Sequence, residues 1–297
     1  MQENEISVPD NPQQTETHTL QAMSFSEILD GMFSLYRKHF ALFFRIVIVY
    51  FILRYTFDKI TQLFLFESLS DGDPAALFIT TVITYLIAIL VSGALSYASA
   101  EVLFGRTITT NAAYQHTLSK YFPLLVAFII YVLVCTGLAI TCIGIPFFIF
   151  FLVRWSVYTL PILIENQSTM GALRRSAELV RNSWWRVCGI ILAILIIFLM
   201  IQSILINSFG IVFFLLTGTN ETEMFGIIRQ MFLPTPLDIG WGLYLIRSFV
   251  TIAIEAITTP ISVIGSTLLY FDLRVRKEAY DLEMQATQQQ DQQDQQV

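Results

Sequence analysis

The chain has 297 residues, of which 55% are hydrophobic and only 13% charged, with a mean hydropathy of +0.64. This composition is typical of an integral membrane protein and excludes an ordinary soluble domain. Of the 23 acidic residues, six lie in polar terminal segments, and the remaining 17 balance the 17 basic residues of the body from 21 to 285. Because the body has no basic excess, we expect no nucleic-acid partner.

The two terminal segments differ from the rest of the chain. Residues 1–22 have neither a basic nor an apolar region of a cleaved signal peptide, and we interpret them as a disordered polar arm. Residues 285–297 are rich in Gln and Asp and predict a second disordered tail. The intervening residues 23–284 are expected to form one polytopic helical membrane domain.

The membrane domain begins with a predicted amphipathic helix. Ser24 and Glu27 have the spacing of a capping box at its start. A basic and aromatic segment, 37–40, leads into a first apolar span from about 40 to 57, followed by an acidic loop. A second span, 75–104, is expected to end at Gly105.

Two further groups of elements follow the same order. Residues 107–120 form a weaker amphipathic segment before a third span, 123–141, and a fourth that ends near 164. Residues 168–183 predict a stronger amphipathic helix, and spans five and six follow. The apolar face of this helix is Met170, Leu173, Ala177, Val180 and Trp184.

Spans five and six are predicted at 187–216 and 241–271, and Pro260 is expected to kink the sixth. The predicted fold is therefore an all-α integral membrane protein with six transmembrane helices and amphipathic interfacial helices. The order of elements indicates three repeated units, each an interfacial helix followed by a membrane hairpin. Ordinary membrane proteins also carry basic and aromatic residues at their inner interface, so this alternative origin of the similarity stays open.

The distribution of basic residues predicts the topology. The segments before span one, between spans two and three, between four and five, and after six hold eleven Lys or Arg, whereas the opposite segments hold only Lys59 and Arg229. By the positive-inside rule, we expect a multi-pass protein of the bacterial cytoplasmic membrane with both termini in the cytoplasm.

Charged residues after span six favour a helical extension into water. Asp272 with Arg276, Arg274 with Glu278, and Lys277 with Asp281 are spaced as i,i+4 pairs. Asp272, Arg274, Arg276 and Glu278 together form the C-terminal motif.

Several segments carry a family resemblance. Residues 172–176 (ALRRS), 184–186 (WWR) and 154–155 (RW) resemble the membrane domain found beside glycerophosphoryl diester phosphodiesterases, and 268–278 (LLYFDLRVRKE) resembles its closing motif closely. The resemblance covers most of 24–283 and implies a polytopic helical domain without an assigned activity. The catalytic barrel of those enzymes needs about 250 further residues, so no catalytic residue can be carried over.

Catalytic and metal-binding patterns give no candidates. The three histidines are scattered, and no Zn-protease, nucleophile-elbow or phosphate-loop motif occurs in a convincing context. We therefore expect a non-enzymatic protein with no cofactor, no metal site and no catalytic residue.

Ionisable residues within the spans are the main functional candidates, because a charge in hydrocarbon requires a partner or water. Arg154 is predicted near the middle of span four, and Arg247 and Glu255 lie in span six. We hypothesise that Arg154 contacts Glu255, with Arg247 nearer the outer surface. Such a contact is either a structural ion pair that locks two helices or part of a polar path or ligand site.

The basic face of the helix at 168–183 is a second candidate. Arg174, Arg175 and Arg181 could bind anionic lipid headgroups, or could simply reflect the positive-inside rule.

Two functions follow from these candidates. The first is a membrane protein that organises lipid or unknown protein partners at the cytoplasmic face. The alternative is a transporter of small solutes or lipids that uses the intramembrane charges, which requires a cavity that reaches Arg154 and Glu255.

Overall fold

The computed structural model describes residues 22–65, 74–141, 143–217 and 241–294, and the side chains of 22–61, 78–141, 143–212, 242 and 245–279. Regular secondary structure in these residues is α-helical throughout. Six of the helical segments are long and apolar enough to cross a bilayer. The prediction of an all-α, multi-pass membrane protein with six spans is confirmed.

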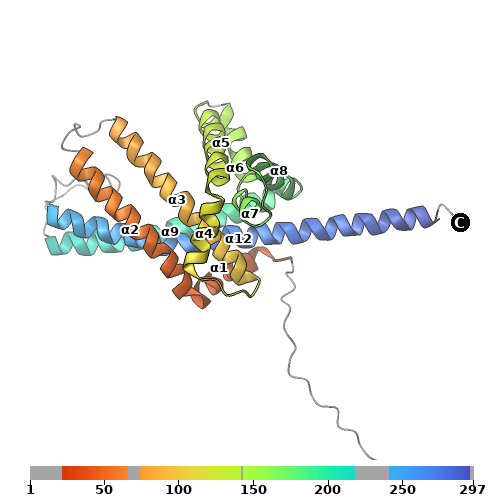
Figure 1. The fold of residues 1–297 in the computed structure, drawn as a ribbon, viewed down its shortest axis with the longest axis horizontal. Helices are drawn as coiled ribbons and strands as arrows, with labels where there is room; N and C mark the ends of the chain where they lie inside the picture. The colour runs from red at the N-terminus through yellow and green to blue at the C-terminus, as the bar shows by residue number, and fades with distance from the viewer. Residues whose placement is uncertain (1–21, 66–73, 142, 218–240, 295–297) are drawn as a thin grey trace, which may run out of the picture.

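A short helix precedes a pair of apolar spans three times along the described chain, and the second span of the middle pair consists of α6 and a further short helix. The three groups are α1 (Phe25–Lys38) with α2 (Phe40–Leu65) and α3 (Pro74–Leu103), α4 (Thr110–Ser119) with α5 (Tyr121–Ala139) and α6 (Gly144–Arg154), and α8 (Thr169–Val180) with α9 (Trp184–Thr217) and α12 (Trp241–Asp294). The three hairpins diverge from the region where α1, α4 and α8 gather (Figure 1). The predicted order of the units is therefore observed.

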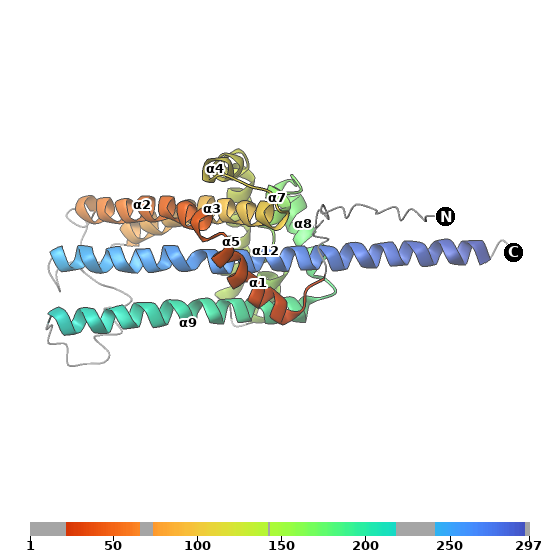
Figure 2. The same ribbon diagram turned by 90° about the horizontal axis from the view of Figure 1, so that it is seen from below.

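Helix α12 is the central element of the packing. It runs along the whole length of the molecule beside α9 and projects beyond the other helices (Figure 2). Gly265 permits this packing, because a Cβ atom there would lie 2.9 Å from Ile194 of α9 and 3.2 Å from Met32 of α1. The buried side chains Ile264, Leu268 and Phe271 continue the same core.

Two predicted helix boundaries are formed by the expected residues. At the start of α1, Ser24 caps the Glu27 amide, and the Glu27 carboxylate accepts a hydrogen bond of 2.6 Å from the Ser24 amide. After α3, Gly105 adopts a φ of +72°, a conformation that costs glycine little.

The second half of the fourth span differs from the prediction of one continuous helix. Helix α6 ends at Arg154, turns occupy 155–158, and the short α7 (Thr159–Leu163) follows. Pro161 lies inside α7 and is buried. The span is thus two helical pieces joined by a bend, which changes the position of every side chain after Val153.

Two further helices extend beyond their predicted ends. Helix α2 continues to Leu65, through part of the expected acidic loop, whose remaining residues 66–73 lie outside the described ones. Helix α12 runs through Pro260 without interruption and continues to Asp294, into the segment 285–297 that was predicted to be disordered. Gln and Ala are good helix formers, so this segment is compatible with a helix once α12 has been nucleated.

Candidate functional site

Glu255 lies about midway along the sixth span, and its carboxylate faces α2. The Tyr50 hydroxyl donates a hydrogen bond of 2.6 Å to Oε1 of Glu255. Tyr50 is 5% exposed and belongs to the protein core. The carboxylate predicted to be functional is therefore held by a tyrosine of another span.

The predicted contact between Arg154 and Glu255 is not formed among the described side chains. Arg154 is the last residue of α6, where its carbonyl accepts a hydrogen bond of 3.0 Å from the buried Ser176 hydroxyl of α8. Its guanidinium lies over the Phe150 ring, 5.5 Å from the ring centre. Arg154 lies near the middle of the fourth span, Gly144–Leu163, as predicted, but α6 ends there and its last residue is bonded to Ser176 of α8.

A cavity of about 360 Å³ adjoins Glu255 and is lined by α2, α3, α5, α12 and the bend between α6 and α7. Glu255 is the charged residue of this lining, and no lysine or arginine among the described residues contributes to it. Neither Arg154 nor Arg247 lines the cavity. Hydroxyl groups make up most of the polar lining: Tyr50, Tyr85, Ser92, Ser96, Ser156, Tyr158, Thr159, Thr259, Ser262 and Ser266.

Most of these hydroxyl groups already donate a hydrogen bond within the protein. Thr259, Ser262 and Ser266 of α12 donate to carbonyls of their own helix at 2.7, 2.9 and 3.0 Å. Ser92 and Ser156 do the same at 3.2 and 2.9 Å. A hydroxyl that donates in this way offers only lone pairs to a ligand. Together with the Glu255 carboxylate, the lining is therefore richer in acceptors than in donors.

A line of polar side chains connects the cavity with the far end of α2. Tyr50, Arg54 and Asp58 are spaced by four residues and therefore share one face of the helix. Arg54 pairs with Asp58 at 3.4 Å, and Lys59 approaches Asp58 at 3.0 Å. The Nε atom of Arg54 is buried without a hydrogen-bond partner among the described residues.

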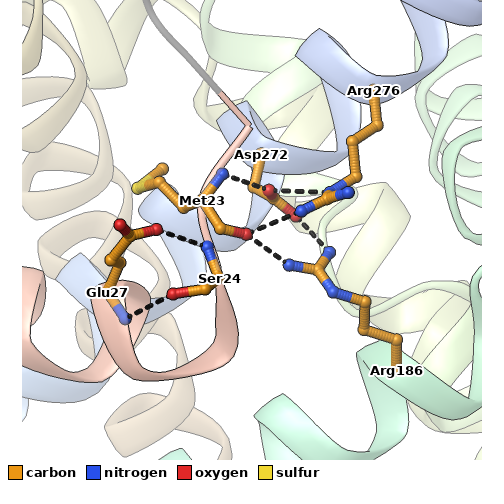
Figure 3. Close-up of polar contacts among 6 residues, drawn as sticks. All are labelled: Met23, Ser24, Glu27, Arg186, Asp272 and Arg276. Atoms are coloured by element: carbon orange, nitrogen blue, oxygen red, sulfur yellow. Dashed lines mark hydrogen bonds and ion pairs between the residues drawn. The ribbon is translucent and has the colours of Figure 1, made fainter.

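The C-terminal motif forms a closed polar cluster at the basic end, which we define as the end of the bundle that carries α1, α4 and α8. Asp272 is fully buried and accepts hydrogen bonds from the Met23 amide at 2.8 Å and from Arg276 at 3.0 Å. Arg186 pairs with the other carboxylate oxygen. Arg186 and Arg276 also donate to the Met23 carbonyl, at 2.6 and 2.8 Å (Figure 3).

A second network uses the other half of the motif. Glu165 accepts hydrogen bonds from Tyr270 at 2.6 Å and from Arg175 at 3.2 Å. Arg274 pairs with Glu278 at 2.8 Å, and Arg175 approaches Glu278 at 3.9 Å. The predicted pairs of Asp272 with Arg276 and of Arg274 with Glu278 are confirmed, whereas the Asp281 side chain lies outside the described residues.

The three predicted lipid-binding arginines of α8 differ in their surroundings. Arg175 is held by Glu165 and Glu278 and is therefore occupied. Arg174 is exposed and pairs with Glu178 at 3.0 Å, and Arg181 is exposed. Met170, expected on the apolar face, is 65% exposed, because α8 buries Ala172, Ser176 and Leu179 beside Leu173, Ala177 and Val180.

Sequence reasoning missed Tyr50, Arg186 and Glu165 as partners of the charged residues. Their contacts join residues 205, 86 and 105 positions apart, and no local spacing reveals such pairs. The available signal for Tyr50 was its position one turn before Arg54 on the first span.

No group of three or more His, Cys, Asp or Glu side chains among the described residues is arranged to hold a metal ion. Comparison with known protein families, with curated proteins and with solved structures found no match to the chain. The resemblance to the phosphodiesterase-associated membrane domain therefore stays a prediction.

Proposed function

We propose that the protein is a non-enzymatic membrane protein that binds a small organic cation, or the amine headgroup of a lipid, in the Glu255 cavity and carries it across the membrane. The observation that supports this most is the position of Glu255, which borders a cavity and has a tyrosine instead of a basic residue as its partner. A sealed arginine–glutamate pair would have favoured a purely structural role.

The chemistry of the lining specifies the ligand class. A carboxylate and several hydroxyl lone pairs attract ammonium groups and other donors, and a site of a few hundred Å³ suits a small molecule. The line from Tyr50 to Asp58 supports a hydrated path from the cavity along α2, because Arg54 has a buried N–H group that water could satisfy.

Ethanolamine is a suitable probe of this function. We expect millimolar ethanolamine to raise the Tm of the purified protein and to be taken up by proteoliposomes that contain it. Glu255→Gln should abolish both effects, and Glu178→Gln, which removes an exposed carboxylate of α8, should leave them unchanged. Equal stabilisation by ethylene glycol, which has a similar size but no charge, would contradict the proposal, as would normal uptake by the Glu255→Gln variant.

The cellular arrangement is part of the same proposal. The eleven-to-two distribution of basic residues supports a bacterial cytoplasmic membrane protein whose basic end and both termini face the cytoplasm. A fluorescent protein fused after residue 297 should then fluoresce, and alkaline phosphatase fused there should be inactive.

Organisation of partner proteins at the basic end is a second candidate function. It is favoured by the exposure of Met170, Arg174 and Arg181 on one short helix. A photo-crosslinker at position 170 should give a defined protein adduct that is lost when Arg174 and Arg181 are both changed to Gln. Unchanged adducts in that double variant would exclude recognition by these arginines.

A further inference from the structure

A second, larger cavity of about 640 Å³ lies at the basic end and shares no lining residue with the Glu255 cavity. Four parts of the chain surround it: residues 22–27 at the start of α1, the end of α1 with the start of α2, the end of α3 with the turn after it, and α12. Gly105 makes this turn possible, because its φ of +72° reverses the chain directly after α3.

The cavity lies at the edge of the apolar spans. Lys38 and His39 precede the first span at Phe40, and Leu103 is the last residue of the second. Phe40 and Phe104, adjacent in sequence to lining residues, are 45% and 40% exposed. Aromatic side chains at the end of spans are typical of the membrane–water interface, where phospholipid headgroups lie.

One wall of the cavity is apolar. Leu35 of α1, Leu42 of α2, Leu103 of α3, and Leu268 and Phe271 of α12 contribute to it. These side chains offer hydrocarbon contact to the upper part of an acyl chain. A soluble anion would have no use for this wall.

The polar part of the lining favours an anion. Lys38 is exposed and makes no ion pair with the described residues, and Arg106 is 68% exposed with a single pair to Glu101 at 3.5 Å. The Thr107 and Ile108 amides make no hydrogen bond within the described part of the chain and are available as further donors.

The other titratable groups of the lining offset only part of this charge. Glu27 accepts a hydrogen bond from the Ser24 amide, which lowers the pKa of its carboxyl group and keeps it ionised, so that it offsets one of the two cations while its carboxylate is engaged in the helix cap. Burial and the neighbouring Lys38 lower the pKa of His39 below its usual value near 6.5, so its imidazole is neutral at pH 7.

We propose that this cavity binds an anionic phospholipid, with the headgroup phosphate between Lys38 and Arg106 and an acyl chain along the leucine-rich wall. The site differs from the one expected on α8, where Arg175 is occupied by two carboxylates. A free phosphate could use the same cations, but only a lipid uses the apolar wall as well.

The test is lipid selectivity of the full-length protein. Native mass spectrometry of the protein released from nanodiscs of phosphatidylglycerol and phosphatidylcholine should show retained phosphatidylglycerol. The Lys38→Gln and Arg106→Gln double variant should lose about tenfold in this preference, since each basic group near the surface contributes to binding of anionic lipid. Both side chains are exposed, so the variant should fold normally.

The matched control removes the same charge from α8. The Arg174→Gln and Arg181→Gln double variant should keep its preference for phosphatidylglycerol, and an equal loss there would show general surface attraction and overturn the proposal. Stabilisation by inorganic phosphate equal to that by phosphatidylglycerol would also overturn it, in favour of a soluble anion. The Glu255 cavity is separate, so the lipid-selectivity measurements do not depend on whether the protein takes up ethanolamine.

Discussion

Asp272 and Glu255, two of the carboxylates of helix α12, lie roughly 25 Å apart along its axis at 1.5 Å per residue, and their surroundings are opposite. Asp272 is fully buried and receives hydrogen bonds from two arginines and a backbone amide. Glu255 has one tyrosine partner and borders a cavity. The first carboxylate has no capacity left for a ligand, whereas the second keeps an oxygen and a space beside it.

The comparison separates structural from functional charges within one membrane helix. Desolvation makes an unpaired buried charge costly, so a chain that needs only stability surrounds it with donors, as around Asp272. A carboxylate left beside a cavity is not explained by stability. We therefore assign the fixed architecture to Asp272 and the ligand to Glu255.

The strongest test of this difference is Asp272→Asn. The substitution leaves Arg186 and Arg276 without their shared counter-charge, and we expect a loss of about 3 kcal/mol in the free energy of unfolding. Unfolding of the purified protein in mixed micelles measures it. Glu255→Gln is the matched control and should cost no more than about 1 kcal/mol, because the amide oxygen can still accept from Tyr50. Equal losses at the two positions would remove the distinction.

Arg186→Gln tests the contribution of α9 to the Asp272 cluster. The variant loses the pair with Asp272 and the bond to the Met23 carbonyl, and we expect a destabilisation of about 2 kcal/mol. Arg181→Gln removes an exposed cation of the same region and should stay within about 0.5 kcal/mol of the original protein in the same unfolding assay. A neutral effect of Arg186→Gln would mean that the cluster does not hold the basic end together.

Tyr50→Phe removes the hydrogen bond to Glu255 and should lower the free energy of unfolding by about 1 kcal/mol, less than Asp272→Asn or Arg186→Gln. The affinity for ethanolamine should also change, since the tyrosine orients the carboxylate. Tyr85→Phe removes a half-exposed hydroxyl of the same cavity and serves as the control. If both variants bind ethanolamine like the original protein, Tyr50 does not position Glu255.

The elements that local patterns define could be predicted from the sequence. Long apolar segments predicted the six spans, the spacing of Ser24 and Glu27 predicted the helix cap, and Gly105 predicted the end of α3. Pairs four residues apart, such as Arg274 with Glu278, were also predicted, because they depend only on helix geometry.

The candidate site was only half predictable. Glu255 was identified because a carboxylate in an apolar span is unusual, but its partner was sought among basic residues, and depth was counted along a straight helix. Helix α6 is continuous from Gly144 to Arg154, so the count holds for Arg154, but this residue is bonded to Ser176 of α8 and not to Glu255. The packing of α1, α9 and α12 around Asp272 depends on the whole fold, so no local pattern indicated that this residue of a segment expected to face water is buried.

The hydrogen bonds of Met23 bear on the order in which the protein assembles. Its amide is bound by a side chain 249 residues later in the sequence, and its carbonyl by arginines of the fifth and sixth spans. Since a chain is synthesised from its N-terminus, α1 emerges long before the groups that hold it exist. Docking of the first helix is thus completed only after the last span has been inserted, and a nascent chain that stops before residue 272 has both an undocked α1 and an uncompensated Arg186.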